Sequence, residues 1–315
     1  MLKFTMFDRV SKVFWIVILI SVWMLPSITT AGDQKSSSTE PDGLPLWEAL
    51  SLGVIEGMTE YLPISSTGHL LIFQAWLGKD ATADETEAAN ALAICIQSGA
   101  ILAVVVLYFG RLQQIFRGLL GGDPAGLRLL IHLIIGFLPA AVFGLLFQRI
   151  IKEQLFNIRS VTFAVLAGGV LILLLSRSKK IDGEVVEKEM TDMRWWEALV
   201  VGCLQCMAFW PGFSRSLATI LGCRAVKLRM SDAVEFSFLL GLITLTAATA
   251  KEGLSHGSKI FEHYGVASPA LALIVAFVSA VISVKFMVRV LSSYGLTPFG
   301  YYRLLLAALC LFLWK

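Results

Sequence analysis

Residues 53–69 read Gly53-Val-Ile-Glu56-Gly-Met-Thr-Glu60-Tyr-Leu-Pro63-Ile-Ser65-Ser66-Thr67-Gly-His69 and interrupt an otherwise apolar segment of the chain. The apolar segment begins at Trp47, stops at Pro63 and resumes over residues 65–77. Each piece is shorter than the roughly 20 residues that span a bilayer, and proline ends a helix because it lacks a backbone N–H. The pattern therefore predicts a helix that breaks inside a membrane and restarts as a second half-helix.

A second broken segment repeats this pattern further along the chain. Trp196-Glu-Ala-Leu199 repeats Trp47-Glu-Ala-Leu50, and Pro211-Gly212 then interrupts the apolar run as Pro63 does. Each broken segment precedes three apparent membrane crossings, and an odd number of crossings turns the second unit upside down. We therefore expect an inverted-topology repeat whose broken helices meet near the bilayer midplane. Its halves are residues 46–190 and 191–315.

The composition of the 315-residue chain indicates a membrane protein, because 57% of the residues are hydrophobic and 16% are charged. Soluble proteins have about 45–50% apolar and about 25% charged residues. A soluble globule, a disordered chain and a small secreted disulfide protein are therefore excluded, and an all-α polytopic membrane protein is expected. Besides the broken segments, six apolar segments are expected to cross the membrane: residues 91–109, 129–147, 158–175, 233–250, 269–291 and 301–314.

The first 45 residues differ from the rest of the chain. Lys3, Arg9 and Lys12 precede an apolar run over residues 13–25, which is followed by small residues and a polar stretch. This order is typical of a signal peptide, and the apolar run is short for a membrane span. Residues 1–45 are interpreted as a signal-like or anchor segment with a polar linker, and its cleavage stays open.

The charge of the chain bears on its partners and its orientation. The net charge of +3 is small and scattered, which argues against nucleic acid as a partner. Eleven Lys and Arg residues lie in the loops expected on one side, and six lie in those on the other. The positive-inside rule places the richer set in the cytoplasm. The richer set comprises loops 110–128, 176–194 and 224–232, and the poorer set comprises loops 78–90, 148–160 and 251–268.

The first break carries two carboxylates and a run of hydroxyls. Glu56 and Glu60 are four residues apart, so a helix presents both on one face. Carboxylates at membrane depth repel each other and require a cation, a shared proton or a cationic partner. Ser65-Ser66-Thr67 begins the second half-helix, where hydroxyls and free backbone N–H groups both favour an anion. His69 follows on the next turn.

The second break adds a permanent cation, Arg215, between two hydroxyls, Ser214 and Ser216. If a pseudo-twofold axis relates the halves, the N-termini of both restarted half-helices converge, and each contributes about half a positive charge. Such a site suits a phosphate or diphosphate, with the carboxylates holding a divalent metal or acting as a base. N-capping accounts for part of the role of the hydroxyls. Gln97 and Gln205 are interpreted as interhelical hydrogen-bonding residues.

With these two breaks in this order, the chain resembles the undecaprenyl-diphosphatase (bacitracin-resistance) family of integral membrane enzymes. The resemblance rests on Glu56-Gly-Met-Thr-Glu60, Leu62-Pro-Ile-Ser-Ser-Thr-Gly-His69 and Pro211-Gly-Phe-Ser-Arg-Ser216, and it spans roughly residues 46–314. It implies an inverted-repeat helical fold. It also implies a hydrolase that removes the terminal phosphate of undecaprenyl diphosphate and leaves the monophosphate carrier for cell-wall glycan synthesis.

The resemblance also implies roles for the residues of the first break. Glu56 and Glu60 correspond to the acidic pair of the family, which is implicated in catalysis and in binding a divalent cation, Mg²⁺ or Ca²⁺. Ser66 corresponds to a serine proposed as nucleophile or phosphate ligand. Ser65 and Thr67 lie beside it as expected phosphate-binding residues.

The remaining correspondences concern one histidine and the second break. His69 corresponds to the histidine of the family and is an expected catalytic residue. Arg215 and Ser214 correspond to the Ser-Arg pair that holds phosphate, and Ser216 is expected to bind phosphate beside them. Leu217 departs from the pattern, because the family commonly has glycine there. It is expected to crowd the second half-helix and to affect rate or substrate fit.

Two questions about function stay open. The nucleophile is either Ser66 or a water activated by Glu60 or His69. Transporters also use inverted repeats with broken helices, so a lipid-phosphate transporter or flippase with the same anion site is the alternative to a hydrolase.

The expected partners are a polyprenyl diphosphate and the lipid bilayer, and a homodimer stays open. The expected location is the bacterial cell (inner) membrane, with the site open to the outer face.

Overall fold

The structure is a computed structural model that describes residues 44–77, 83–177 and 187–313. The segment at residues 1–45 therefore lies outside the described residues, except for its last two. Within the described ranges the chain is helical and forms no strand, and one isolated bridge pairs Lys188 with Leu228. The expected all-α class is confirmed.

Four helices are long and apolar enough to cross a bilayer. They are α6 (Pro124–Leu155), α7 (Ile158–Arg177), α10 (Met230–Tyr264) and α11 (Ala267–Tyr294). A fifth span results if α4 (Ala83–Leu107) is counted together with α5 (Phe109–Leu119), which follows a bend of 76°. The last predicted crossing forms α12 (Thr297–Leu313), which is apolar and has 17 residues. The chain is therefore a polytopic membrane protein.

The outer faces of these helices carry large apolar side chains. Leu145 and Leu146 on α6 are each 70% exposed, and Ile282 on α11 is 59% exposed. Such side chains are unfavourable in water, whereas lipid tails are as apolar as leucine. The exposed faces therefore fit a bilayer.

The structure corrects the loop predicted over residues 110–128, because most of it is helical. Helix α5 occupies its first half, and α6 begins at Pro124 after Asp123 caps it by accepting from the Gly126 N–H at 2.9 Å. A Cβ added at Gly126 would lie 2.1 Å from the Gln114 carbonyl oxygen. Glycine at this position therefore allows α5 and α6 to pack closely as a hairpin. The sequence prediction had treated this segment only as a loop rich in basic residues.

Both predicted broken segments are present. The first consists of α2 (Leu46–Thr59) and α3 (Ser66–Trp76), and the second of α8 (Trp195–Gln205), the 3₁₀ turn η2 (Cys206–Phe209) and α9 (Arg215–Ala225). Each first half ends earlier than predicted, because the chain leaves the α-helix several residues before the proline. The breaks are consequently wider than the sequence indicated.

The two half-helices restart in the same way. Ser65 has a φ of 75° before α3, and Ser214 has a φ of 82° before α9. The Ser65 Oγ accepts from the Gly68 N–H at 3.2 Å, and the Ser214 Oγ accepts from the Leu217 N–H at 3.3 Å. Both serines are therefore helix N-caps, as expected, and both hold a left-handed backbone that costs free energy in a residue with a side chain.

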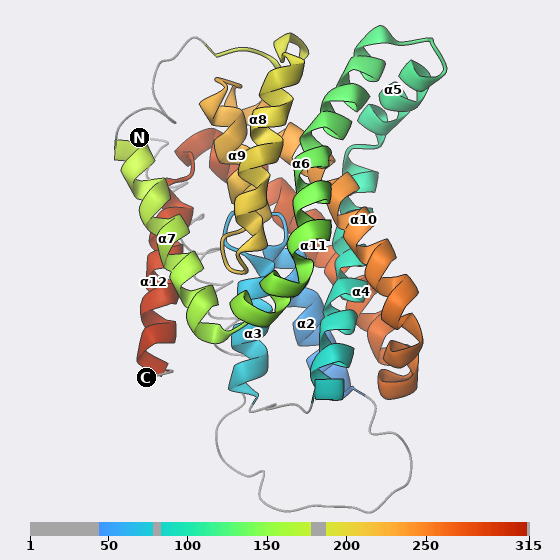
Figure 1. Cartoon of the computed structure of the whole chain (residues 1–315), viewed down its shortest axis with the longest axis vertical. Helices are drawn as coiled ribbons and strands as arrows, with labels where there is room; N and C mark the ends of the chain where they lie inside the picture. The colour runs from blue at the N-terminus through green and yellow to red at the C-terminus, as the bar shows by residue number, and fades with distance from the viewer. Residues whose placement is uncertain (1–43, 78–82, 178–186, 314–315) are drawn as a thin grey trace, which may run out of the picture. The chain divides into compact units, whose positions relative to one another are not determined.

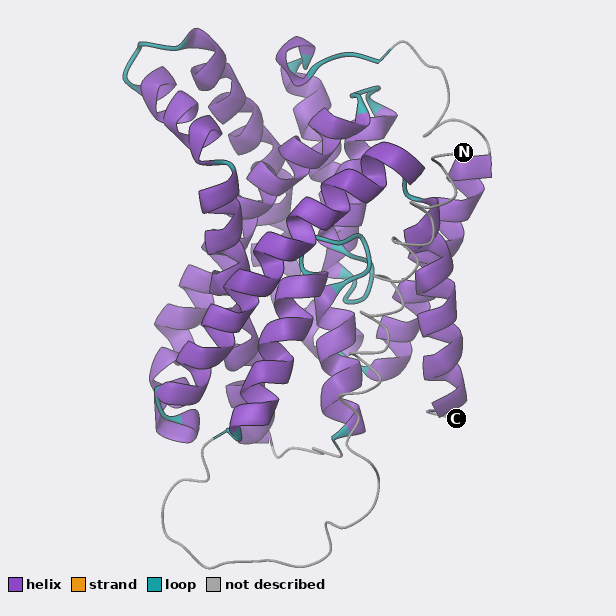
Figure 2. Ribbon diagram, turned by 180° about the vertical axis from the view of Figure 1, so that it is seen from behind, coloured by secondary structure: helices purple, strands orange, loops and turns teal. Residues whose placement is uncertain are grey.

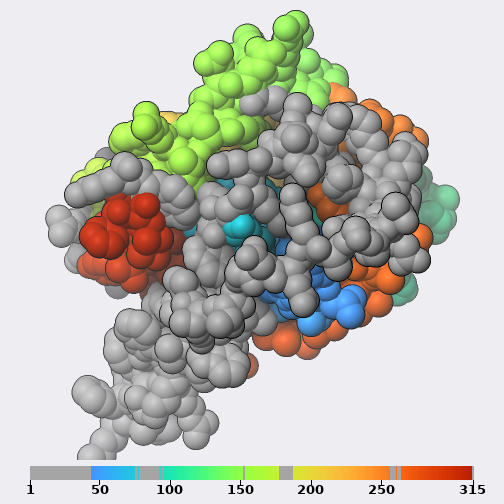
Figure 3. Space-filling model, turned by 90° about the horizontal axis from the view of Figure 1, so that it is seen from below, coloured from blue at the N-terminus to red at the C-terminus, as the bar shows by residue number. Residues whose placement is uncertain are grey.

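The two broken segments lie in opposite halves of the described helical unit. Figure 1 shows α2 and α3 in the lower half and α8 and α9 in the upper half. Figure 2 shows the interrupting loops in teal at mid-height among the helices, and Figure 3 shows α12, α6 and α11 around the end at which α2 and α3 lie. The predicted inverted repeat requires this opposed entry, and the symmetry between the halves stays a prediction.

Small residues bring the broken segments close to the long helices. A Cβ at Gly57 on α2 would lie 2.3 Å from the Ala276 carbonyl oxygen of α11. A Cβ at Gly202 on α8 would lie 2.4 Å from the Gly136 carbonyl oxygen of α6. Close backbone approach at small residues is typical of helix packing in membranes, and here it holds both breaks inside the helix bundle.

Candidate active site

A polar cavity of about 180 Å³ lies where the two breaks meet. The first break contributes Glu60, Ser65, Ser66 and Thr67, and the second contributes Pro211, Gly212, Ser214 and Arg215. Helices α4, α6, α8 and α10 complete the wall with Gln97, Ala140, Gln205, Thr244 and Leu245, joined by Ala208 and Phe209 of η2. The structure thus brings six of the nine predicted site residues to one cavity.

Arg215 and Glu60 connect the two breaks inside this cavity. The Arg215 Nη2 lies 3.2 Å from the Glu60 Oε1, and the two side chains are only 9% and 6% exposed. The Arg215 Nη1 donates to the Ser237 carbonyl oxygen at 3.1 Å, and its Cζ lies 5.5 Å from the centre of the Tyr61 ring. Its Nε is buried and has no hydrogen-bond partner among the described residues. Arg215 therefore retains one buried donor for a ligand.

Glu60 also accepts from a hydroxyl of its own break. The Ser66 Oγ donates to the Glu60 Oε2 at 2.5 Å, so the two carboxylate oxygens serve a hydroxyl and a guanidinium separately. Both Ser66 and Glu60 line the cavity and are buried. A hydroxyl in such a short contact with a carboxylate can transfer its proton to it as it attacks.

Glu56 lies behind Glu60 rather than on the cavity wall. Its side chain is 2% exposed and contacts the Glu60 carboxyl. Two buried carboxyls in contact cannot both be ionised without a proton or cation between them. Glu56 can therefore hold a proton or a cation next to Glu60, although it does not face the cavity itself.

Ser216 is the second predicted residue that does not line the cavity. Its Oγ donates to the Leu62 carbonyl oxygen at 2.9 Å, and the Ser214 Oγ reaches the same oxygen at 3.4 Å. Both serines thereby attach the second break to the backbone of the first. Leu217, which was expected to crowd α9, is fully buried away from the cavity.

His69 is the third predicted residue that the structure keeps away from the cavity. Its Nδ1 lies 2.7 Å from the Ser65 carbonyl oxygen and must donate to it, and its Nε2 lies 2.7 Å from the Tyr302 hydroxyl. The two rings are stacked with centroids 5.7 Å apart. Both ring nitrogens are therefore occupied, and this arrangement orients the start of α3 against α12.

Arg303 on α12 is a residue that the sequence analysis missed. It is 0% exposed and donates to carbonyl oxygens of both breaks, Pro63 at 3.2 Å and Gly212 at 2.8 Å. It also donates to Ala164 at 3.0 Å and Val165 at 3.1 Å on α7. A charged residue within an apolar membrane segment usually has a functional or positioning role. Arg303 is such a residue in the apolar segment 301–314, so this rule would have identified it.

Gln97 and Gln205 make the interhelical hydrogen bonds expected of them. The Gln97 Oε1 accepts from Thr249 at 3.4 Å, and the Gln205 Oε1 accepts from Thr244 at 3.4 Å. Both glutamines nevertheless line the cavity, and the Gln205 Nε2 is buried without a partner within the described ranges. An unpaired buried amide donor is costly, so Gln205 is a further group available to an anion.

The donor set decides which metal the site could hold. Among the described residues, no group of three His, Cys, Asp or Glu side chains is positioned for a metal ion. The groups near the cavity are the carboxylates of Glu56 and Glu60, hydroxyls and amides, which suits a hard cation with oxygen ligands. Mg²⁺ is usually held by one or two carboxylates together with substrate phosphates and water, so the residues present fit such an ion.

The fold and the cavity define a class: a polytopic helical membrane protein with a buried polar cavity where two interrupted helices meet. Residues 49–309 match the family described as bacitracin resistance protein BacA. The chain belongs to this family.

Curated relatives cover most of the chain. An undecaprenyl-diphosphatase from Sorangium cellulosum is 42% identical over 268 residues, which are 85% of this chain and 86% of the relative. An undecaprenyl-diphosphatase from Maridesulfovibrio salexigens is 41% identical over 274 residues, or 86% and 99% of the two chains. One from Nitrosomonas europaea is 42% identical over 265 residues, or 84% and 92%.

Proposed function

We propose that this chain is an undecaprenyl-diphosphatase, which hydrolyses the terminal phosphate of a polyprenyl diphosphate and releases the monophosphate. The contact between Arg215 and Glu60 beside Ser66 carries the proposal, because it joins an anion-binding group, a base and a nucleophile in one buried cavity. The names of the relatives and the family membership support the same reaction.

Binding of the phosphate rests on donors that the cavity already contains. The Arg215 Nε and the Gln205 Nε2 are buried and unpaired within the described part of the chain. The first N–H groups of α3 and α9 have no carbonyl one turn before them, and the helix dipoles add positive charge at these ends. These groups would hold the terminal phosphate and stabilise the negative charge that it develops during transfer.

The chemical step begins with proton transfer to Glu60. When Arg215 turns to the phosphate, the Glu60 carboxylate keeps its contact with the Ser66 hydroxyl and acts as the base. In one route that proton comes from the Ser66 Oγ, which attacks phosphorus while the bond to the bridging oxygen breaks, and water then hydrolyses the phosphoserine. In the other route Glu60 takes the proton from a water that attacks directly.

Glu56 and Glu60 would hold a divalent cation together with the substrate oxygens. Bound there, the cation would offset the charge of the diphosphate and of the leaving monophosphate. His69 has no role in this scheme, because both of its ring nitrogens are engaged away from the cavity.

The proposal places the protein in the bacterial inner membrane. The exposed apolar faces support a multi-pass location. The excess of Lys and Arg in segments 110–128, 176–194 and 224–232 of the sequence supports a cytoplasmic end opposite the entry of α2 and α3. The site would then serve the outer, periplasmic face. All groups of the scheme come from one chain, so a homodimer is not required.

Phosphate release by the detergent-purified protein tests the function. We expect release from undecaprenyl diphosphate and from farnesyl diphosphate, its loss with a chelator, and its recovery with Mg²⁺ or Ca²⁺. A folded protein that binds the diphosphate without releasing phosphate, with or without metal, would contradict the proposal. That result would favour the transporter alternative, which the relatives do not favour.

A further inference from the structure

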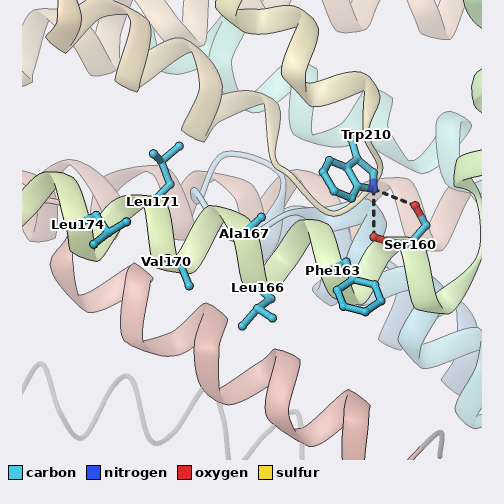
Figure 4. Close-up of a pocket in the computed structure, with 8 residues that line it drawn as sticks. All are labelled: Ser160, Phe163, Leu166, Ala167, Val170, Leu171, Leu174 and Trp210. Atoms are coloured by element: carbon cyan, nitrogen blue, oxygen red, sulfur yellow. Dashed lines mark hydrogen bonds between the residues drawn. The ribbon is translucent and has the colours of Figure 1, made fainter.

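An apolar groove runs along the outer side of α7, next to the second break. Its volume is about 770 Å³. Figure 4 shows its lining side chains along successive turns of α7, with Trp210 above them. The lining residues are Ser160, Phe163, Leu166, Ala167, Val170, Leu171, Leu174 and Trp210.

Trp210 connects this groove to the catalytic cavity. Its chain neighbours Phe209 and Pro211 line the cavity, whereas Trp210 itself lines the groove. Its indole Nε1 donates to the carbonyl oxygen and the Oγ of Ser160, at 3.0 and 2.8 Å (Figure 4). The indole is therefore fixed against α7, between two chain neighbours that line the cavity.

The inner side of α7 holds the same loop in place. A Cβ added at Gly212 would lie 2.5 Å from the Val161 carbonyl oxygen, so the loop lies directly on this helix. One nitrogen of Arg303, Nη2, donates both to Gly212 and to Ala164 of α7, at 2.8 and 3.0 Å. The loop of the second break is consequently held on α7 by a close backbone approach at Gly212 and by the buried Arg303 side chain.

The groove and the cavity have opposite chemistry. The polar atoms of Ser160 and Trp210 satisfy each other, and every other lining side chain of the groove is hydrocarbon. The cavity carries carboxylate, hydroxyl, amide and guanidinium groups in about 180 Å³, which leaves no room for a long tail. A polar cavity that adjoins an apolar groove of ordinary ligand size, about 300–1,000 Å³, suits a ligand with a charged head and a hydrocarbon tail.

We propose that the α7 groove binds the isoprene units of the substrate next to its diphosphate, with Trp210 at the junction of head and tail. This inference rests on the proposed phosphatase function. Burial of the first units against α7 would fix the direction in which the diphosphate enters the cavity. Affinity would then depend on the tail as well as on the phosphate contacts.

A matched pair of valine substitutions tests the groove. Val170 lines it and is 41% exposed, whereas Val278 on α11 is 51% exposed and lies outside it. We expect Val170→Trp to fill the groove and raise the KM for undecaprenyl diphosphate about tenfold, with kcat little changed. Val278→Trp should leave KM unchanged, and a five-carbon diphosphate should give the same KM with Val170→Trp as with the original protein.

Crosslinking on the unaltered protein gives a second measurement that does not depend on folding of a variant. A polyprenyl diphosphate with a photoreactive group on its second isoprene unit should label the α7 peptide that contains Phe163 and Val170. Labelling confined to α10 or α11 would contradict binding in the α7 groove, and so would an equal change of KM in both tryptophan variants. Neither result would contradict the phosphatase function. Absence of phosphate release from every diphosphate would overturn both.

Discussion

Arg215 and Glu60 are 155 positions apart in the sequence and 3.2 Å apart in space. The guanidinium comes from the second break and the carboxylate from the first, so the contact exists only when both interrupted helices meet. Each side chain compensates the charge of the other while the site holds no phosphate. In the proposed mechanism, an incoming diphosphate would compete with Glu60 for Arg215.

Replacing Arg215 should reduce turnover more than binding. We expect Arg215→Ala to lower kcat by about 10²- to 10³-fold, because a charge-assisted contact that strengthens in the transition state is lost. Arg215→Lys should recover little of it, since an ammonium lacks the planar fork of donors. Phosphate-release kinetics measure both effects, with Arg149→Ala, an exposed ion-pair residue on α6, as the control. Wild-type kcat in a folded Arg215→Ala protein would contradict the mechanism.

Ser66→Ala should remove the hydroxyl that contacts Glu60. We expect kcat to fall by about 10²-fold or more, because either the nucleophile or the group that orients Glu60 is lost. Ser292→Ala is a suitable control, because the exposed Ser292 hydroxyl donates only to the Val288 carbonyl oxygen of its own helix, α11. Mass spectrometry of acid-quenched protein distinguishes the routes, because only attack by Ser66 leaves a phosphate on this residue. Unchanged kcat in Ser66→Ala would exclude both roles.

The two capping serines should respond differently to glycine and alanine. Ser65→Gly and Ser214→Gly lose the cap but tolerate a positive φ, so we expect a stability loss of a few tenths of a kcal/mol. Ser65→Ala and Ser214→Ala lose the cap without relieving the backbone strain that the serines already carry, so a loss of about 0.5–2 kcal/mol is expected. Thermal denaturation in detergent measures the stability of each variant. Equal stability of the glycine and alanine variants would argue against a strained cap.

Arg303 should act as a positioning residue, because its donors reach the backbone of both breaks rather than the cavity. We expect Arg303→Met to lower stability by about 2–4 kcal/mol, since four buried carbonyl oxygens lose their donors, and also to lower kcat as the breaks separate. Arg303→Lys should recover part of the stability and part of kcat. Lys285→Met, on an exposed face of α11, is the control.

Activity and denaturation of the same Arg303 preparations separate two roles. A loss of stability with unchanged kcat and KM in the folded fraction would limit Arg303 to a structural role. A loss of kcat at unchanged stability would instead indicate a contact with the reacting groups.

The interrupted helices and most of the site could be predicted from local sequence. Pro63 and Pro211 cannot continue a helix, and the hydroxyls after them are typical N-caps, so both restarts are readable from a few neighbouring residues. Charged side chains in apolar surroundings pointed to Glu60 and Arg215 for the same local reason. The contact between Glu60 and Arg215 was inferred from the repeat, and it is present in the structure.

Other features depended on packing that no local pattern contains. The contact of His69 with the Tyr302 hydroxyl on α12 is one such feature, and the hydrogen bonds of Arg303, on the same helix, to both breaks are another. The hairpin of α5 and α6 depends on a close approach at Gly126. Neither the partner of a side chain nor the distance between two helices is encoded in the spacing of residues along one segment.

The sequence by itself determined where the helices stop, which side chains carry charge at membrane depth and which hydroxyls cap the restarted half-helices, because these properties follow from neighbouring residues. The tertiary structure decided which groups share the cavity and which face α12 or lipid. That choice depends on contacts between residues far apart in the chain, and these form only when the helices pack against one another.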